Sequence, residues 1–151
     1  MRVVGVGNRW RSDDGIGPAV AARLRELAPD LDVVVREGEP VALLDALEGA
    51  GAAVVVDAVS SGGAPGTVHR LDATTEPLPR ELFARSTHHL GLADAVELGR
   101  ALDRLPARLV VVGIEGASWD AGDELSPEVA AALEPAAAAV LEEVARCTSA
   151  R

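Results

Sequence analysis

Residues 2–35 of the chain read RVVGVGNRWRSDDGIGPAVAARLRELAPDLDVVV, and this stretch decides the fold. Its two ends, Arg2–Val6 and Leu31–Val35, are short runs rich in valine, which is typical of buried strands. The apolar residues between them recur at helical spacing, at Ile16, Val20, Leu24 and Leu27. Ala28-Pro29-Asp30 then ends the helix, because a proline disfavours helical backbone in the residue before it. The stretch therefore predicts a strand, a crossover helix and a second strand.

The rest of the chain continues this alternation. Two more buried strands are predicted at Ala53–Val56 and Leu109–Ile114, and a short edge strand at Thr67–Leu71. Two more helices are predicted at Pro40–Leu47 and Leu92–Leu102. Ser126-Pro127 is a suitable N-cap and first-turn pair for a final helix, which Pro135 must kink or split. We therefore expect a single α/β domain over residues 1–151, with a twisted, mainly parallel sheet of about five strands and helices on both faces.

The composition excludes several classes of chemistry. All 14 residues counted as lysine or arginine are arginine, and the chain also lacks tyrosine. A Schiff-base lysine, a P-loop and a Ser-Tyr-Lys dehydrogenase site are therefore impossible. A single cysteine, Cys147, cannot form an internal disulfide, which fits a reducing cytoplasm.

The charge and the hydropathy pattern argue against two classes of partner, nucleic acids and membranes. The formal net charge is -10 and the arginines are scattered, so we expect no nucleic-acid partner. No run of about 18 apolar residues occurs, and two aspartates follow soon after the opening strand. We therefore expect no signal peptide, no membrane span and a soluble, cytoplasmic protein.

Three loops carry the residues that could perform chemistry, because ligands in open α/β sheets collect at the carboxyl ends of the strands. The first is the glycine-rich loop Gly5–Gly17, the second contains Asp57 after Val54-Val55-Val56, and the third is Ser86–Leu90. The first loop does not fit a dinucleotide fingerprint, since Trp10 stands where the last glycine of GxGxxG belongs. Two aspartates at the start of the helix would also repel a pyrophosphate.

Each candidate side chain also has a simpler structural interpretation. Asp13 or Asp14 could cap the helix, Asp57 could cap a loop, and His88 and His89 could be capping or surface residues. Two carboxylates and an imidazole on converging loops nevertheless form a ligand set that suits nickel or zinc better than magnesium. An aspartate or histidine acting as general base without a metal is the alternative for hydrolysis.

At this point the sequence resembles the hydrogenase maturation proteases, the endopeptidases that trim the C-terminus of nickel-iron hydrogenase large subunits. The family's opening motif G-x-G-N-x-x-x-x-D-[DE]-x-x-G appears as Gly5-Val6-Gly7-Asn8 through Asp13-Asp14-Gly15-Ile16-Gly17. Its strand-end aspartate appears as Val56-Asp57-Ala58, and its S-x-H-x-[LM] motif as Ser86-Thr87-His88-His89-Leu90. The resemblance covers nearly the whole chain.

The resemblance implies a metal site with Asp14, Asp57 and His88 as ligands, and Asp14 and Asp57 as candidate catalytic residues. His89 does not match the family's ligand position. Asn8 and Gly38 are candidate substrate-binding residues. The metal implied is the nickel already loaded into the partner, the precursor of a large subunit, although zinc or cadmium can occupy such a site. Whether hydrolysis is of the aspartic type or metal-dependent stays open.

The chain departs from the family pattern after the second strand. Many members have Gly-Gly-[Ser/Thr] there, whereas this chain has Arg36-Glu37-Gly38-Glu39-Pro40. Arg9-Trp10-Arg11 also replaces residues that are more often apolar, so a change of partner specificity is implied. Two other functions remain open at this point. One is a nonproteolytic hydrolase such as a peptidyl-tRNA hydrolase, although arginine rather than proline follows Asn8; the other is a noncatalytic nickel-binding assembly protein.

Overall fold

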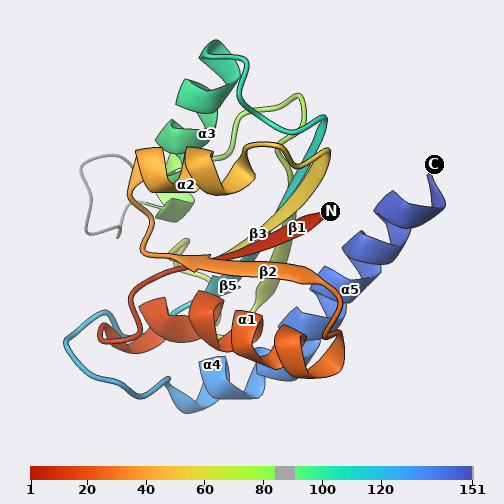
Figure 1. The fold of residues 1–151 in the computed structure, drawn as a ribbon. Coiled ribbons are helices and arrows are strands. Elements are labelled where there is room, and N and C mark those ends of the chain that lie inside the picture. The colour runs from red at the N-terminus through yellow and green to blue at the C-terminus, as the bar shows by residue number, and fades with distance from the viewer. Residues whose placement is uncertain (84–90, 151) are drawn as a thin grey trace.

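Five strands form one sheet in the order β2-β1-β3-β5-β4 (Figure 1). The computed structural model describes residues 1–83 and 91–150. Within them the strands are β1 (Arg2–Val6), β2 (Asp32–Arg36), β3 (Ala52–Val59), β4 (Val68–Asp72) and β5 (Arg108–Glu115). All neighbouring strands pair in parallel except β4 and β5, which are antiparallel. The expected mainly parallel sheet with a short edge strand is therefore confirmed, and the carboxyl ends of β1, β2, β3 and β5 lie along the same edge.

Helices cover both faces of this sheet (Figure 1). On one face lie α1 (Ile16–Leu27), the short α4 (Pro127–Ala131) and α5 (Leu133–Ser149). On the other face lie α2 (Pro40–Leu47) and α3 (Leu92–Ala101). Two short 3-10 helices, η1 (Ser12–Gly15) and η2 (Arg80–Phe83), connect strands to helices near the carboxyl edge.

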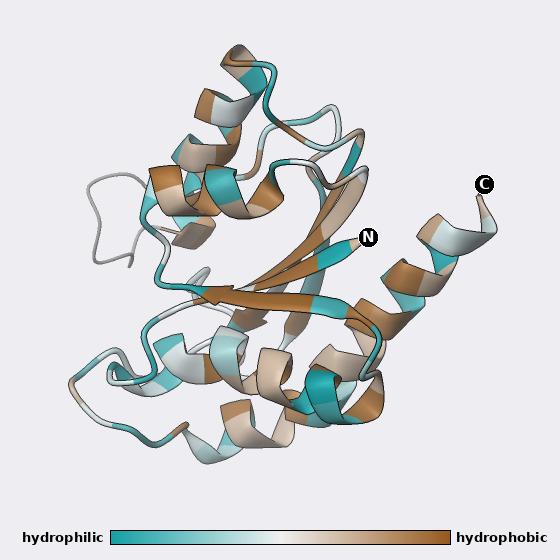
Figure 2. Cartoon of the chain, in the orientation of Figure 1, coloured by the Kyte–Doolittle hydropathy of each residue, from teal (hydrophilic) through white to brown (hydrophobic). Residues whose placement is uncertain are grey.

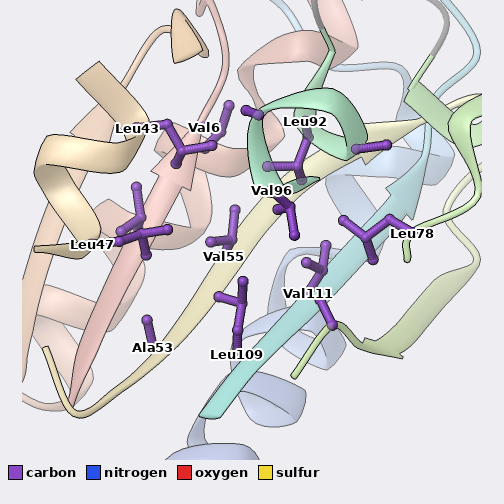
Figure 3. Close-up of a cluster of buried hydrophobic side chains, with 14 of the residues drawn as sticks. Val6, Leu43, Leu47, Ala53, Val55, Leu78, Leu92, Val96, Leu109 and Val111 are labelled. Atoms are coloured by element: carbon purple, nitrogen blue, oxygen red, sulfur yellow. The ribbon is translucent and has the colours of Figure 1, made fainter. Parts of the chain in front are cut away.

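Each face has its own hydrophobic core, because successive strand residues point to opposite sides. Val55 and Val111 point toward α2 and α3, and pack with Leu43, Leu47, Val96 and Leu109 (Figure 3). Val54 and Val112 point the other way and pack with Val20, Leu24, Ala136 and Val140. Burial on both faces explains why the strands are continuous apolar runs rather than alternating ones, as the hydropathy of the central strands in Figure 2 shows.

The first helix lies unusually close to the strands, and glycines make this possible. A Cβ at Gly17 would lie 2.1 Å from the carbonyl oxygen of Val6 and 2.7 Å from that of Val56. A Cβ at Gly5 would lie 2.6 Å from the carbonyl oxygen of Gly17. The two glycines therefore let the backbone of α1 contact the backbone of β1 and β3 directly.

Several boundaries differ from the predicted ones. β3 extends to Val59 rather than ending at Val56, so Asp57 lies inside the strand. The additional residues pair with β5 up to Glu115, a long-range contact that a local pattern does not reveal. The final helix is split into α4 and α5 at Ala132, three residues before Pro135, as the proline predicted.

Within the described ranges, none of the helices is both long enough and apolar enough to cross a bilayer.

We predict that Gly17→Ala destabilises the protein by about 3 kcal/mol, because the new methyl group would overlap two backbone oxygens that cannot move aside. The free energy of unfolding from urea denaturation measures this. Gly51→Ala is the matched control, since a Cβ there meets nothing within 4 Å. We expect it to change the free energy of unfolding by less than about 1 kcal/mol. Equal stabilities of the two variants would contradict the close contact of α1 with the sheet.

Candidate functional site

A pocket opens at the carboxyl edge of the sheet, on the face covered by α2 and α3. Both Asp14 and Asp57 line it. The other lining residues come from β1, the loops after β1, β2 and β5, β3 itself, and the helices η2, α2 and α3: Val6, Gly7, Glu37, Gly38, Leu43, Ala58, Leu82, Phe83, Leu92 and Trp119. Asp14, Asp57 and Glu37 thus share a pocket whose other walls are largely apolar.

Asp14 is placed by the tight turn between β1 and α1. Its carboxylate oxygen Oδ2 accepts a hydrogen bond of 2.8 Å from the backbone N–H of Asn8. Gly7 has φ 144°, and a Cβ there would lie 1.9 Å from the carbonyl oxygen of Asp14. The second glycine of the G-x-G-N motif is therefore required so that the loop can fold back over Asp14.

Asp57 is placed by the central strand β3. Burial raises the pKa of Asp57 well above its ordinary value, and the negative charge of Asp14 raises it further. A hydrogen bond of 2.8 Å from the N–H of Ala58 opposes these effects but does not offset them. Two carboxylates that resist being charged together favour either a proton or a cation between them. The pair is thus suited to general acid–base chemistry or to holding a metal ion.

The neighbouring Asp13 has a different role. Its side chain is fully buried and its carboxylate accepts four hydrogen bonds of 2.7–2.8 Å, from the N–H groups of Ala117, Ser118 and Ser126 and from the hydroxyl of Ser126. Burial would raise the pKa of Asp13, but these hydrogen bonds outweigh it and the pKa is lowered. Asp13 therefore anchors the loop between β5 and α4.

These contacts correct two of the capping interpretations. Gly15, rather than Asp13 or Asp14, occupies the N-cap position of α1. Ser126 does occupy the N-cap position of α4, but its hydroxyl donates to Asp13 instead of accepting from the helix. The loop cap proposed for Asp57 is present only as the bond from Ala58 within β3.

Of the remaining predicted site residues, one lines the pocket, one shapes the first loop, and the two histidines are not described. Gly38 lines the pocket, with φ 95°. The side-chain oxygen of Asn8 accepts the N–H of Trp10 at 2.9 Å and so shapes the loop. A role of either residue in substrate binding stays a prediction. His88 and His89 lie outside the described residues.

The pocket also contains residues that were not among the predicted site residues. Glu37 and Trp119 line it, and each follows the carboxyl end of a parallel strand, where a ligand-facing residue is expected. Their place after a parallel strand was the one feature of the sequence from which Glu37 and Trp119 could have been predicted as pocket residues. Among the described residues, no group of three or more His, Cys, Asp or Glu side chains is arranged to hold a metal ion. The pair Asp14 and Asp57 supplies two carboxylate ligands.

Comparisons with known proteins point in one direction. A family model described as hydrogenase maturation protease matches residues 21–143. The hydrogenase 2 maturation protease of Escherichia coli K12 is 34% identical over 92% of this chain and 87% of its own length. The hydrogenase expression/formation protein HupD of Thiocapsa roseopersicina is 31% identical over 95% of this chain and 67% of its own.

Solved structures give the same result. The hydrogenase maturating endopeptidase HybD from E. coli aligns with a TM-score of 0.74 at 28% identity, over 97% of this chain and 92% of that one. The [NiFe] hydrogenase maturation protease HybD from Thermococcus kodakarensis aligns with a TM-score of 0.71 at 28% identity, over 95% and 97% of the two chains. The architecture described above is therefore shared along almost the whole chain.

We predict that Asp13→Asn lowers the free energy of unfolding at neutral pH by about 2–4 kcal/mol, since an amide cannot accept all four hydrogen bonds and its NH₂ group would face backbone donors. Asp120→Asn, at an exposed position in the same loop, is the control and should be neutral.

The difference should also depend on pH. The pKa of Asp13 is lower in the folded than in the unfolded protein, so its contribution is complete above the unfolded pKa of about 3.9 and is lost as pH falls through the folded pKa. The gap between wild type and Asp13→Asn should therefore be constant near neutral pH and shrink below pH ~4 in urea denaturation. A gap that widens on acidification would contradict the lowered pKa.

Proposed function

We propose, because this chain belongs to the hydrogenase maturation protease family, that it is an endopeptidase acting on the precursor of a nickel-iron hydrogenase large subunit. In this proposal it removes the C-terminal extension of that subunit. The observation that supports this most strongly is the pair Asp14 and Asp57 in one pocket at the carboxyl edge of the sheet. The cytoplasm is the compartment we propose for the reaction.

The pocket suits a substrate that brings a cation. Asp14 and Asp57 together present negative charge inside largely apolar walls, and each raises the cost of charging the other. A large subunit that already contains nickel would offset this repulsion, whereas a nickel-free precursor would not. We therefore propose that the loaded metal, part of the substrate, is what the protease recognises, with His88 as a third ligand named by the sequence motif.

The two carboxylates also differ in a way that suits peptide hydrolysis. The raised pKa of Asp57 keeps more of this carboxyl group protonated than an ordinary aspartate, so it can donate a proton to the leaving amine. Asp14 shares the pocket and is held in place by the N–H of Asn8, so it is the carboxylate left to accept a proton from the attacking water. Polarisation of the scissile carbonyl by the substrate's own metal is compatible with both roles. The division of labour between the two aspartates is our proposal.

The first test replaces each carboxyl group by an amide of the same shape that cannot exchange a proton. We predict that Asp14→Asn and Asp57→Asn each lower the rate of precursor cleavage at least about 100-fold, the lower range for loss of an acid–base group. Cleavage is followed by the mobility shift of the large subunit on a gel, and circular dichroism checks the fold. Asp45→Asn, at an exposed position paired with Arg104, is the control and should cleave normally. Normal cleavage by both site variants would show that the site is elsewhere.

A second test concerns the metal ligands. We predict weak binding of nickel, zinc or cadmium by the free protein, lost below pH ~6 as imidazole becomes protonated. In titration calorimetry His88→Ala should lose most of this affinity and His89→Ala should keep it. The opposite ranking would mean that the histidine motif has been aligned one residue out of register.

A further inference from the structure

A second acidic residue at the carboxyl edge is buried but plays no part in the proposed chemistry. Glu115 is the last residue of β5 and its side chain is 1% exposed. In the sheet it lies opposite Val59, while Asp57 lies opposite Gly113. Because strand residues alternate between faces, Glu115 and Asp57 project from the same face, toward α2 and α3.

The carboxylate of Glu115 is held by two other segments. The backbone N–H of Ser61 donates to both of its oxygens at 3.2 Å, and the Ser61 hydroxyl also hydrogen-bonds to Oε1. Nε2 of His69, in β4, lies 3.1 Å from the same Oε1. A buried carboxylate is costly unless donors surround it, so these contacts fix the three segments relative to one another.

The backbone of Glu115 closes the same loop from its other end. Its carbonyl oxygen accepts the N–H of Gly66 at 2.8 Å, and its own N–H donates to Thr67 at 2.9 Å. The side chain of Glu115 therefore holds the start of the loop of residues 60–66, and its backbone holds the end of that loop.

This loop is attached directly to the pocket wall. The N–H of Ser60 donates to the carbonyl oxygen of Leu82, in η2, at 2.8 Å. Leu82 and Phe83 line the pocket that contains Asp57. A continuous path of contacts thus runs from Glu115 through Ser61 and Ser60 to η2.

We infer that Glu115, held by Ser61 and His69, is a positioning residue for cleavage. It fixes the position of η2, whose residues Leu82 and Phe83 line the pocket, relative to Asp57. This inference rests on the proposed endopeptidase function. It assigns Glu115 no contact with substrate. Its effect passes through the loop 60–61 to Leu82 and Phe83.

The chain offers a matched control in a second buried glutamate. Glu143, in α5, is 3% exposed and pairs with Arg70, Arg108 and Arg146. Arg108 is the first residue of β5 and Glu115 the last, so the two glutamates contact opposite ends of one strand. Glu143→Gln removes the carboxylate of a buried glutamate as Glu115→Gln does, but away from the pocket.

The first measurement is hydrogen exchange of the Ser60 amide by NMR, corrected for global stability. In Glu115→Gln we expect exchange about tenfold faster than in wild type, because the loop loses its anchor, and in Glu143→Gln we expect no change. Unchanged exchange at Ser60 in Glu115→Gln would overturn the inference.

The second measurement is kcat/KM for cleavage of the nickel-loaded precursor, at a temperature where all variants are folded. We expect kcat/KM to fall by about 10- to 100-fold in Glu115→Gln and by less than about threefold in Glu143→Gln. Small displacements of residues that line an active site lower the rate strongly, whereas similar displacements far from the site do not. His69→Gln keeps a donor toward Glu115 and should restore most of the kcat/KM that His69→Leu loses. Equal losses in the two glutamate variants would overturn the positioning role alone. Wild-type protein that leaves the loaded precursor uncut would overturn the proposed function and the role of Glu115 with it.

Discussion

The backbone of the first turn of α1 is pressed against the ends of β1 and β3, and the rest of the site depends on this contact. There is no space for a side chain at Gly17, and almost none at Gly5. With the helix so close, Gly7 must turn the chain back over Asp14 with a positive φ. The result is that Asp14 lies at the carboxyl edge of the sheet, in the same pocket as Asp57. The glycines of the opening motif thus serve backbone packing, and the packing places the acids.

The buried acids of this protein differ in how many hydrogen-bond donors surround their carboxylates. Asp13 accepts four hydrogen bonds and Glu115 is held by Ser61 and His69, so both keep loops in place. Within the described part of the chain, the hydrogen bond found at the Asp57 carboxylate comes from its immediate neighbour, Ala58. Its pKa is raised, whereas that of Asp13 is lowered. A carboxyl group that is buried without a full set of donors can still bind a proton or a cation, and this distinguishes the acid that we propose as catalytic from the structural ones.

Much of the fold followed from the sequence because its signals are local. The helices Ile16–Leu27 and Pro40–Leu47 and the strand Arg2–Val6 occur where apolar spacing and proline placed them. The site could be predicted only as a set of loops. Adjacent aspartates have identical local chemistry, and only the distant loop at 117–126 separates Asp13 from Asp14. The same holds for Glu115, whose partners lie 46 and 54 residues away in the chain.

The most direct test is the intact mass of a hydrogenase large-subunit precursor incubated with this protein, in nickel-loaded and in nickel-free form. The acidic pocket should accept the loaded form, whose cation offsets the repulsion between Asp14 and Asp57, and should reject the other. We predict that the loaded precursor loses the mass of its C-terminal extension while the nickel-free precursor keeps its full mass. Cleavage of both forms at the same rate, or of neither, would contradict a cation-dependent protease built on Asp14 and Asp57.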